Sequence, residues 1–426
     1  MTVALQDLVV ERSVPAVAGK RVLVVGINYA PEHTGIAPYT TQACEHLQRE
    51  GADVLVLAGV PHYPHWSVPA DYQGRLRVDE VRRDGVHVRR LRHVVPSQQT
   101  AVKRAAYEAS FGAHVLAQRL PWVPEIVLAV VPSLLGAAAA ARIARRHGAR
   151  LVVWVQDLMG PAAAQSGIAG GGRVAAVTSR LEGRVLRQAD SVLVLNEDFA
   201  AYVRSLGVDS QRIAVRPNWT HVAAPRGDRA GTRRRLGWTH DQVVVLHSGN
   251  MGLKQCLDNV VSAARLAATE APHVRFVLMG DGSQRHELQG RGEDVANLQF
   301  LPPADDASFP DHLAAADVLL VNERAGAVNM SLPSKLTSYF QAAVPVIAAV
   351  PEAGGTSREV RDSGAGLVVE PENPRALLTA VADIQSDRES MSRMRKAGSA
   401  YARGHLSSAP ALQELALDLA GRFPDS

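Results

Sequence analysis

Residues 243–254 read Val-Val-Val-Leu-His-Ser-Gly-Asn-Met-Gly-Leu-Lys, an apolar run that ends in a glycine-containing turn. The run predicts a buried strand over Val243–His247, because parallel strands covered on both faces carry near-continuous apolar residues. Glycine lets the backbone turn sharply after such a strand and enter a helix. An earlier stretch has the same order, since the apolar run Arg21–Ile27 precedes a turn at Gly35 and then a helical segment. The chain therefore begins the same pattern twice.

Apolar strands alternate with helical segments in both halves of the chain. Strands are predicted in the first half over Arg21–Ile27, Asp53–Ala58, Gly85–Leu91, Ile126–Val131, Leu151–Val155 and Ser191–Leu195, with helices that include Pro38–Glu50, Leu134–His147 and Arg173–Gln188. They are predicted in the second half over Val243–His247, Arg275–Met279, Asn297–Leu301, Val318–Val321, Val344–Ala349 and Gly366–Val369. This alternation predicts an α/β protein of two Rossmann-like, doubly wound domains. Ligands of such sheets bind beyond the carboxyl ends of the strands, so we expect a central cleft that both domains face.

The domain boundaries are predicted from changes in composition. We expect a poorly ordered extension over residues 1–19, a first domain over 20–220 and a second domain over 221–405. Arg216–Trp219 and the polar, Pro/Gly/Arg-rich stretch that ends near Gly237 are the predicted linker. Residues 406–426 form an amphipathic tail, predicted as a helix that can cross back to pack on the first domain.

The composition is that of a soluble globular protein, with 46% hydrophobic and 21% charged residues among 426. Cys44 and Cys256 are the two cysteines, so we expect no disulfide framework, a reducing compartment and no metal cluster. The longest uncharged run, Ile126–Ala141, is shorter than the roughly 20 residues that span a bilayer. The N-terminus lacks the features of a signal peptide. These observations predict a cytoplasmic location.

Positive charge is concentrated in the first half of the chain. Residues 1–217 hold 25 Lys and Arg against 18 Asp and Glu, and Arg75–Arg104 holds nine basic residues against three acidic ones. Two interpretations stay open: a solvated basic surface, or a patch that approaches anionic lipid or a phosphate-bearing acceptor at the inner face of the membrane. We expect no nucleic acid partner, because aromatic residues are not interleaved and no nucleic-acid module is recognisable.

Two lysines follow glycine-containing or polar turns in the second half. Backbone N–H groups together with the Lys254 ammonium would form a clamp for a diphosphate, although a plain surface lysine is the alternative interpretation. Lys335, near a predicted helix start, is the second candidate for the phosphates. Gly280–Gly282 is a second glycine turn after a predicted strand, and we interpret it as structural in preference to catalytic.

Polar and aromatic residues follow strands in the first half. The loop 61–66 carries His62, His65 and Trp66, which suit sugar binding because rings stack on pyranose faces and imidazoles bond hydroxyls. A proline-rich structural loop is the competing interpretation. Asp157 ends another predicted strand, where its carboxylate could orient an acceptor or cap a helix.

At these residues the sequence resembles the retaining glycosyltransferases of family 4, in the branch found in colanic-acid, O-antigen and capsule assembly. The resemblance runs from about Arg21 to Phe423. It is carried by Gly26–Glu32, Thr34–Ile36, Pro64–Trp66, Arg104, Glu108–Phe111, Val155–Asp157, Pro217–Trp219, Ser248–Gly252, Lys254, Gly280–Gly282, Ala316–Val318, Pro333–Lys335, Pro345–Ala348 and Gly354–Gly355.

The resemblance implies a GT-B fold, acceptor contacts mainly in the first domain, donor contacts mainly in the second, and retention of anomeric configuration. It implies no metal and no cofactor other than a nucleotide-diphosphate sugar, of the UDP or GDP type, as co-substrate. The sequence departs from the common pattern in three features. Asn250 replaces an arginine, and Gln156 replaces a histidine. The usual pair of glutamates is absent, with Ser338 at the second position and Met330-Ser331 in the region of the first.

These observations predict a glycosyltransferase with Lys254, Lys335 and Asp157 as its catalytic residues. The acceptor residues are predicted to be His62, His65, Trp66 and Glu108. The donor residues are predicted to be Gly35, Ser248, Gly249, Asn250, Gly252, Gly280, Pro302, Ser334, Ser338, Gly355, Thr356 and Glu359. The acceptor could be a cell-surface glycan, a lipid-linked oligosaccharide or a small-molecule natural product, and peripheral membrane association is compatible with it. A nucleotide-sugar epimerase or hydrolase and a catalytically degenerate partner protein are the alternatives.

Overall fold

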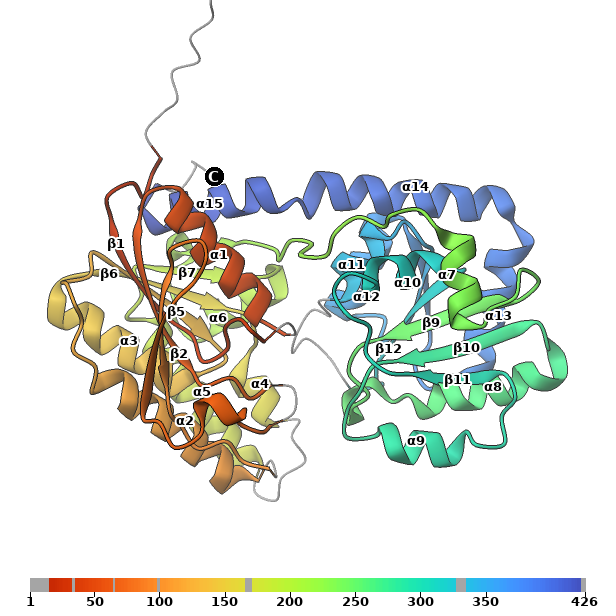
Figure 1. The fold of residues 1–426 in the computed structure, drawn as a ribbon, viewed down its shortest axis with the longest axis horizontal. Helices are drawn as coiled ribbons and strands as arrows, with labels where there is room; N and C mark the ends of the chain where they lie inside the picture. Colours follow the sequence, from red (N-terminus) through yellow and green to blue (C-terminus); the bar gives the residue numbers. More distant parts are fainter. Residues whose placement is uncertain are drawn as a thin grey trace, which may run out of the picture. The chain divides into compact units, whose positions relative to one another are not determined.

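The computed structural model describes residues 15–32, 35–63, 66–97, 100–164, 171–326 and 335–422. The described residues form one eight-stranded and one six-stranded β-sheet, each with flanking helices (Figure 1). The chain divides into two compact units: residues 1–154, 188–192 and 412–426 belong to one, and residues 155–187 and 193–411 to the other. The α/β class with two Rossmann-like domains is therefore confirmed.

The first sheet has the strand order β3-β4-β2-β1-β5-β6-β7-β8. Its strands are β1 (Arg21–Val25), β2 (Asp53–Gly59), β3 (Arg77–Val81), β4 (His87–Leu91), β5 (Ile126–Val131), β6 (Arg150–Val155), β7 (Ser191–Val194) and β8 (Ile213–Val215). The helices between them are α1 (Ala37–Arg49), η1 (Ala70–Tyr72), α2 (Ala101–Leu116), α3 (Leu134–His147), α4 (Met159–Ala164), α5 (Gly171–Leu186), α6 (Glu197–Ser205) and η2 (Ser210–Arg212). β1 pairs in parallel with β2 and β5, which places it at the centre of the sheet.

The second sheet is parallel and has the order β11-β10-β9-β12-β13-β14. Its strands are β9 (Val243–Ser248), β10 (Val274–Met279), β11 (Leu298–Leu301), β12 (Val318–Asn322), β13 (Val346–Ala349) and β14 (Gly366–Val369). Its helices are α7 (Arg229–Leu236), η3 (Leu253–Gln255), α8 (Asp258–Glu270), α9 (Arg285–Arg291), α10 (Phe309–Ala315), α11 (Lys335–Gln341), α12 (Gly355–Ser363), α13 (Pro374–Ser386) and α14 (Arg388–His405). The central strands β9 and β12 end where a ligand of such a sheet would bind.

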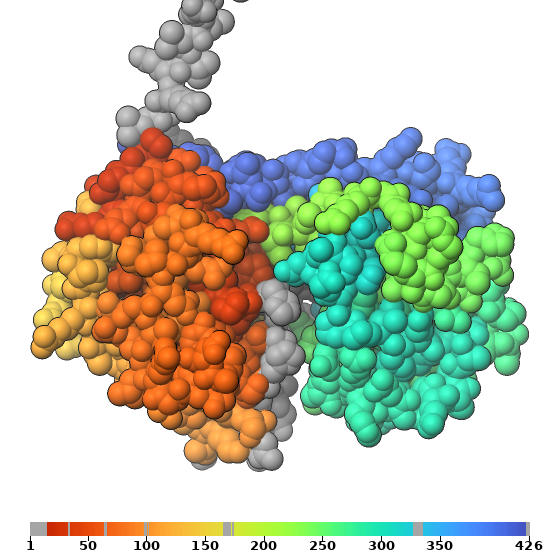
Figure 2. Space-filling view, viewed as in Figure 1, coloured from red at the N-terminus to blue at the C-terminus, as the bar shows by residue number. Residues whose placement is uncertain are grey.

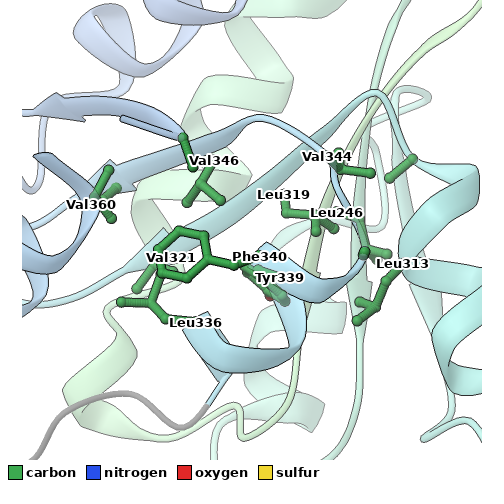
Figure 3. Packing of buried hydrophobic residues seen from close by; sticks show 14 of the residues in the cluster. Leu246, Leu313, Leu319, Val321, Leu336, Tyr339, Phe340, Val344, Val346 and Val360 are labelled. Atoms are coloured by element: carbon green, nitrogen blue, oxygen red, sulfur yellow. The ribbon is translucent and has the colours of Figure 1, made fainter. Parts of the chain in front are cut away.

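Both faces of the second sheet are buried. Leu246 on β9 and Leu319 on β12 point into a core with α11 and α12 (Figure 3), while Val245 and Leu320 point into the core on the other face. This alternation along each strand explains why the strands are apolar at every position. In the core that contains Leu246 and Leu319, the side chains of Tyr339 and Phe340 are fully buried and fix α11 against the second sheet.

Two strands, β3 and β8, were not predicted, and one helix lies in the predicted linker. β3 was not predicted, because its residues are polar and partly exposed and it pairs antiparallel with β4 at the sheet edge. Ion pairs link the two strands, from Arg89 to Asp79 at 2.7 Å and from Arg90 to Glu80 at 3.2 Å.

The predicted linker contains a helix, α7. Asp228 caps its first turn by accepting the Gly231 N–H at 2.9 Å, and Gly237 ends it in the left-handed conformation. The Arg233 side chain is 7% exposed and donates to the backbone oxygens of Thr239 and Gln242. The polar composition of this stretch suggested a linker without structure of its own, but it lies within the predicted second domain, 221–405, and these hydrogen bonds fix α7 there.

The chain ends in two helices, α14 and α15 (Ser408–Leu419). Ala402 and Leu406 of the α14 region belong to the core of the second sheet. Residues from Leu412 onward group instead with the unit that contains β1 to β5. Among the described residues, no helix combines the length and the apolar character that crossing a bilayer requires.

Candidate active site

Two glycine turns interlock at the ends of β9 and β10. Gly249 and Gly280 have φ values of 122° and 141°, which side chains rarely adopt. A Cβ atom on Gly280 would lie 2.0 Å from the Gly249 carbonyl oxygen, so the two backbones approach too closely for any side chain there. The Met251 N–H donates to the Asp281 carbonyl at 2.8 Å and joins the turns further. This close packing fixes the backbone of the predicted phosphate-binding turn.

Lys254 lies on η3, one turn of 3-10 helix that precedes α8. Cys256, with a φ of 44°, separates η3 from α8. The Asn322 amide donates to the carbonyl oxygens of Gln255 and Cys256 at 2.8 and 3.0 Å. The Arg324 N–H donates to the Lys254 carbonyl at 2.9 Å. The end of β12 therefore holds the turn that carries Lys254.

Lys254 and Lys335 gather around one carboxylate. The Lys254 Nζ lies 3.8 Å from Glu323 Oε1, and Glu323 is 5% exposed. The Lys335 Nζ lies 3.2 Å from His247 Nε2, and a Cβ on Gly249 would be 3.5 Å from that same Nζ. Thr356 at the start of α12 hydrogen-bonds to the Glu323 carboxylate. The structure thus brings both predicted catalytic lysines to the glycine turn.

Burial dominates the electrostatics of this cluster. It raises the pKa of Glu323, although Lys254 and Lys335 oppose that shift. It lowers the pKa of Lys335 to about 7, with Glu323 opposing and Lys254 adding to the change. Burial and the Lys335 charge together keep the pKa of His247 well below its ordinary value, so the imidazole is neutral and accepts a hydrogen bond from the ammonium.

Other predicted donor residues surround this cluster at different depths. The Ser248 N–H donates to the Tyr339 hydroxyl at 2.9 Å, and Ser338 on α11 is buried. Asn250 and Gly252 belong to the glycine turn, and Gly355 and Thr356 begin α12. Glu359, one turn further along α12, accepts from the Tyr401 hydroxyl at 3.0 Å. Pro302 is exposed after β11, and Ser334 lies outside the described residues. Whether each of these contacts a donor stays a prediction.

In the first sheet, Glu32 organises the loop after β2. Its Oε1 accepts the backbone N–H groups of His62 and Tyr63, both at 2.8 Å, and Asn28 donates to its Oε2 at 2.9 Å. Gly35, with a φ of 63°, lies beside the Tyr63 ring. A buried carboxylate that accepts three hydrogen bonds is well satisfied. Glu32 therefore ties the loops after β1 and β2 together.

The side chains of this loop form an aromatic cluster. Both ring nitrogens of His62 have partners, the Val60 carbonyl at 2.9 Å and the Tyr107 hydroxyl at 3.2 Å, and burial lowers the pKa of the imidazole. Trp66 is partly exposed, and the Arg104 guanidinium lies over its ring at 5.7 Å. An acceptor hydroxyl would have to displace Tyr107 to reach His62, whereas Trp66 is accessible. His65 lies outside the described residues.

Glu108 and Asp157 occupy different environments. Glu108 is 9% exposed and accepts from the Ser133 hydroxyl and the Leu135 N–H at the start of α3, so its visible role is to cap that helix. Asp157 is partly buried after β6. Its neighbour Gln156 exchanges two hydrogen bonds with Asn218, at 2.7 and 3.0 Å. Their predicted acceptor and catalytic roles stay untested.

Two functional candidates, Glu323 and Glu32, were missed by the sequence analysis. Glu323 follows the apolar run Val318–Val321 after one residue, Asn322, at the carboxyl edge of a parallel sheet, a position that signals ligand contact. Glu32 lies within a quoted segment but was not singled out. Within the described part of the chain, no three His, Cys, Asp or Glu residues converge as a metal site would require.

Comparisons with known proteins agree with this geometry. A glycosyl transferase 4-like domain matches residues 34–219, and the glycosyl transferases group 1 domain matches residues 228–401. WcaI of Escherichia coli (strain K12), provisionally assigned as a glycosyl transferase of colanic acid biosynthesis, is 32% identical over 376 residues, which cover 85% of this chain and 91% of WcaI.

Solved structures show the same fold. A sucrose-phosphate synthase from Thermosynechococcus elongatus matches with a TM-score of 0.74 at 17% identity, covering 93% of this chain and 97% of its own. Anabaena HepE, solved in complex with UDP, matches with a TM-score of 0.68 at 16% identity, covering 94% and 100%. The chain belongs to the family 4 glycosyltransferases of the GT-B fold, and is an enzyme that transfers a sugar from a nucleotide-activated donor.

Proposed function

We propose that the chain transfers a sugar from a UDP- or GDP-linked donor to an acceptor hydroxyl, with retention of anomeric configuration and without a metal ion. The observation that carries this proposal is the pair of ammonium groups, Lys254 and Lys335, at the glycine turn of the second sheet. Two cations beside backbone N–H groups supply the positive charge that a departing diphosphate needs.

The chemistry balances within the two substrates. The bond between the anomeric carbon and the diphosphate oxygen breaks, and a bond from the acceptor oxygen to the same face of that carbon forms. The acceptor proton goes to the departing diphosphate. The protein then has to orient the substrates, exclude water and stabilise charge on the leaving group. Lys254 and Lys335 would perform the last task.

Binding of the nucleotide can be tested by thermal unfolding with UDP, GDP, dTDP, ADP and CDP, each with magnesium and with EDTA. We expect one diphosphate to stabilise the protein selectively and equally under both conditions. At about 100 times its Kd it should add roughly 2.7 kcal/mol to the free energy of unfolding. A well-folded protein that none of the five stabilises would contradict the proposal, and stabilisation that disappears with EDTA would contradict metal independence.

The stabilising nucleotide then defines the donor for an activity assay. Products formed with and without an acceptor separate transfer from donor hydrolysis or epimerisation, because only transfer requires the acceptor. The coupling constant of the anomeric proton in the product, measured by nuclear magnetic resonance, reports retention. An inverted product would overturn that part of the proposal.

For the acceptor, we propose a lipid-linked glycan that the enzyme meets at an anionic membrane surface. α2 supports this, because its exposed residues combine apolar side chains with a lysine: Val102 is 80% and Leu116 48% exposed, and Lys103 and several alanines between them are exposed as well. The only acidic residue of α2, Glu108, is buried. β4 joins this surface, since Arg89 donates to the Arg119 carbonyl at 2.8 Å. Figure 2 shows this segment, in orange, on one face of its unit.

Introducing glutamate at both Val102 and Leu116 should weaken binding to vesicles that contain phosphatidylglycerol by about tenfold or more. The change removes apolar contact area and adds negative charge near anionic headgroups. Vesicle co-sedimentation at low and high salt measures the effect, and neutral phosphatidylcholine vesicles should bind weakly throughout. The matched control replaces Ser262 and Ala268, which are exposed on α8, with glutamate. Equal loss in both double variants, or no loss in the first, would contradict the proposal.

A further inference from the structure

Four ionisable groups from four segments form what we term the lysine–glutamate cluster: His247 at the end of β9, Lys254 on η3, Glu323 after β12 and Lys335 at the start of α11. His247 and Glu323 are buried, and Lys254 and Lys335 are partly buried. The Glu323 carboxylate is the negatively charged member of the cluster: it lies 3.8 Å from the Lys254 ammonium and interacts electrostatically with Lys335. Its neighbours hold it firmly, because its own N–H donates to the Ala349 carbonyl at 3.0 Å.

We propose that Glu323 is the positioning residue that sets the charge of the donor phosphate site, so that binding of a nucleoside diphosphate draws a proton from solvent onto Lys335. This inference rests on the proposed function, because it takes the glycine turn as the place of the diphosphate. Before the donor arrives, Glu323 is the negative charge beside Lys254, and the Lys335 Nζ lies against His247 at the turn. When the diphosphate binds, its negative charge joins that of Glu323 beside the lysines.

The balance of charge in this poorly solvated cluster explains why Lys335 would take up a proton. With Lys335 neutral, the charges of Lys254 and Glu323 cancel, whereas a protonated Lys335 leaves one excess positive charge. Excess charge in a poorly solvated site is costly unless a partner of opposite sign is present. His247 cannot provide that negative charge, because its imidazole is neutral and only accepts a hydrogen bond from Lys335. A bound diphosphate can, and it therefore favours the protonated lysine.

The pH dependence of nucleotide binding follows from the pKa of Lys335 in the protein without nucleotide. The pKa of Lys335 is lowered to about 7 there, mainly by burial, with Glu323 opposing and Lys254 reinforcing the shift. An anion raises that pKa again, so binding takes up little proton below about pH 6 and nearly one proton near pH 8. Affinity should accordingly fall about tenfold for each pH unit above 7, until the pKa of the bound state is reached.

Isothermal titration calorimetry with UDP, and with GDP in parallel, measures this uptake directly. At one pH, the binding enthalpy in buffers of different ionisation enthalpy has a slope equal to the number of protons taken up. The useful range lies above about pH 7, because the terminal phosphate itself ionises at about pH 6. We expect close to one proton per UDP near pH 8 in the natural sequence.

Three variants separate Glu323 from a merely structural residue. Lys335→Arg should bind UDP with no proton uptake, because a guanidinium stays charged at every pH in the range. Glu323→Gln keeps the shape but removes the counter-charge, so the onset of uptake should move to lower pH by about one unit or more. Glu182→Gln is the matched control: Glu182 is also buried with a raised pKa, but it bonds to Tyr202. It should lower the melting temperature without moving the uptake curve.

The outcomes distinguish this inference from the proposed function. Tight UDP binding without proton uptake near pH 8 would overturn the inference and leave the function standing. An uptake curve in Glu323→Gln that coincides with that of the natural sequence would overturn the role of Glu323. Should Glu323→Gln fail to fold, Glu323→Asp keeps the negative charge but moves it away from the lysines. A shift of the proton-uptake curve of Glu323→Asp to lower pH would then support the role of Glu323. Absence of binding by both UDP and GDP would overturn the function and the inference together.

Discussion

Replacing Lys254 with alanine should lower kcat/KM by two or more orders of magnitude and leave the fold intact. Removal of one preorganised donor to a developing negative charge costs about 2.7–4 kcal/mol of transition-state stabilisation. Lys254 is placed for that role, because η3 is held by Asn322 and its ammonium lies 3.8 Å from Glu323 at the glycine turn. Steady-state kinetics with the donor identified by thermal shift measure the effect.

The controls separate charge from packing. Lys254→Met keeps most of the aliphatic stem and should lose activity to the same degree, while circular dichroism shows an unchanged fold. Lys396→Ala removes an exposed lysine of α14 and should leave kcat/KM within about twofold. A near-natural rate in Lys254→Ala would refute the assignment of this lysine to the diphosphate.

Replacing Asp317 with alanine should destabilise the second domain by about 3–5 kcal/mol, because it leaves buried charge without a partner. The Asp317 carboxylate accepts from Arg229 at 2.6 Å, from Arg233 at 2.9 Å and from the Val244 N–H at 2.8 Å. Arg233 is nearly buried, so its guanidinium would keep its positive charge with no carboxylate beside it. The melting temperature should fall by on the order of 10 °C.

Asp294→Ala provides the comparison, in the turn between α9 and β11 of the same domain. Asp294 forms an equally short ion pair with Arg265, at 2.7 Å, but its side chain is 73% exposed. Solvent screens such a pair, so its loss should change the stability much less than the loss of Asp317. Urea unfolding followed by fluorescence would compare the two variants. Similar midpoints would show that α7 and the core of the second sheet do not depend on the Asp317 network.

The fold was predictable because its signal is local. β5 and β14 have the predicted bounds, because their residues are apolar apart from Gly366 and each strand is followed by a residue that breaks the apolar run, Pro132 or Glu370. β3 was not predictable in this way. Its alternating charged residues are satisfied by pairs on β4, which the chain reaches only after a turn, so the strand depends on tertiary partners.

The site was predictable in part, for a related reason. Lys254 and Lys335 were found because each follows a turn beside a strand or helix. Glu323 was missed because its meaning depends on where β12 ends relative to η3, and the hydrogen bonds that fix this join residues more than sixty positions apart. His247 resembles a core strand residue in sequence, and its contact with Lys335 exists only in the folded chain.

The interlocked glycine turns also restrict how this lineage can diversify. A methyl group at position 280 would strike the Gly249 carbonyl, and one at position 282 would meet the Met251 backbone at 2.6 Å. Mutation therefore cannot install a side chain at either position without moving the backbone. If the turn holds the donor as proposed, new donor preferences have to arise from side chains on neighbouring elements such as α11, whose Lys335 borders Gly249. Selection can thus reshape those side chains while the backbone of the turn passes unchanged from ancestor to descendant.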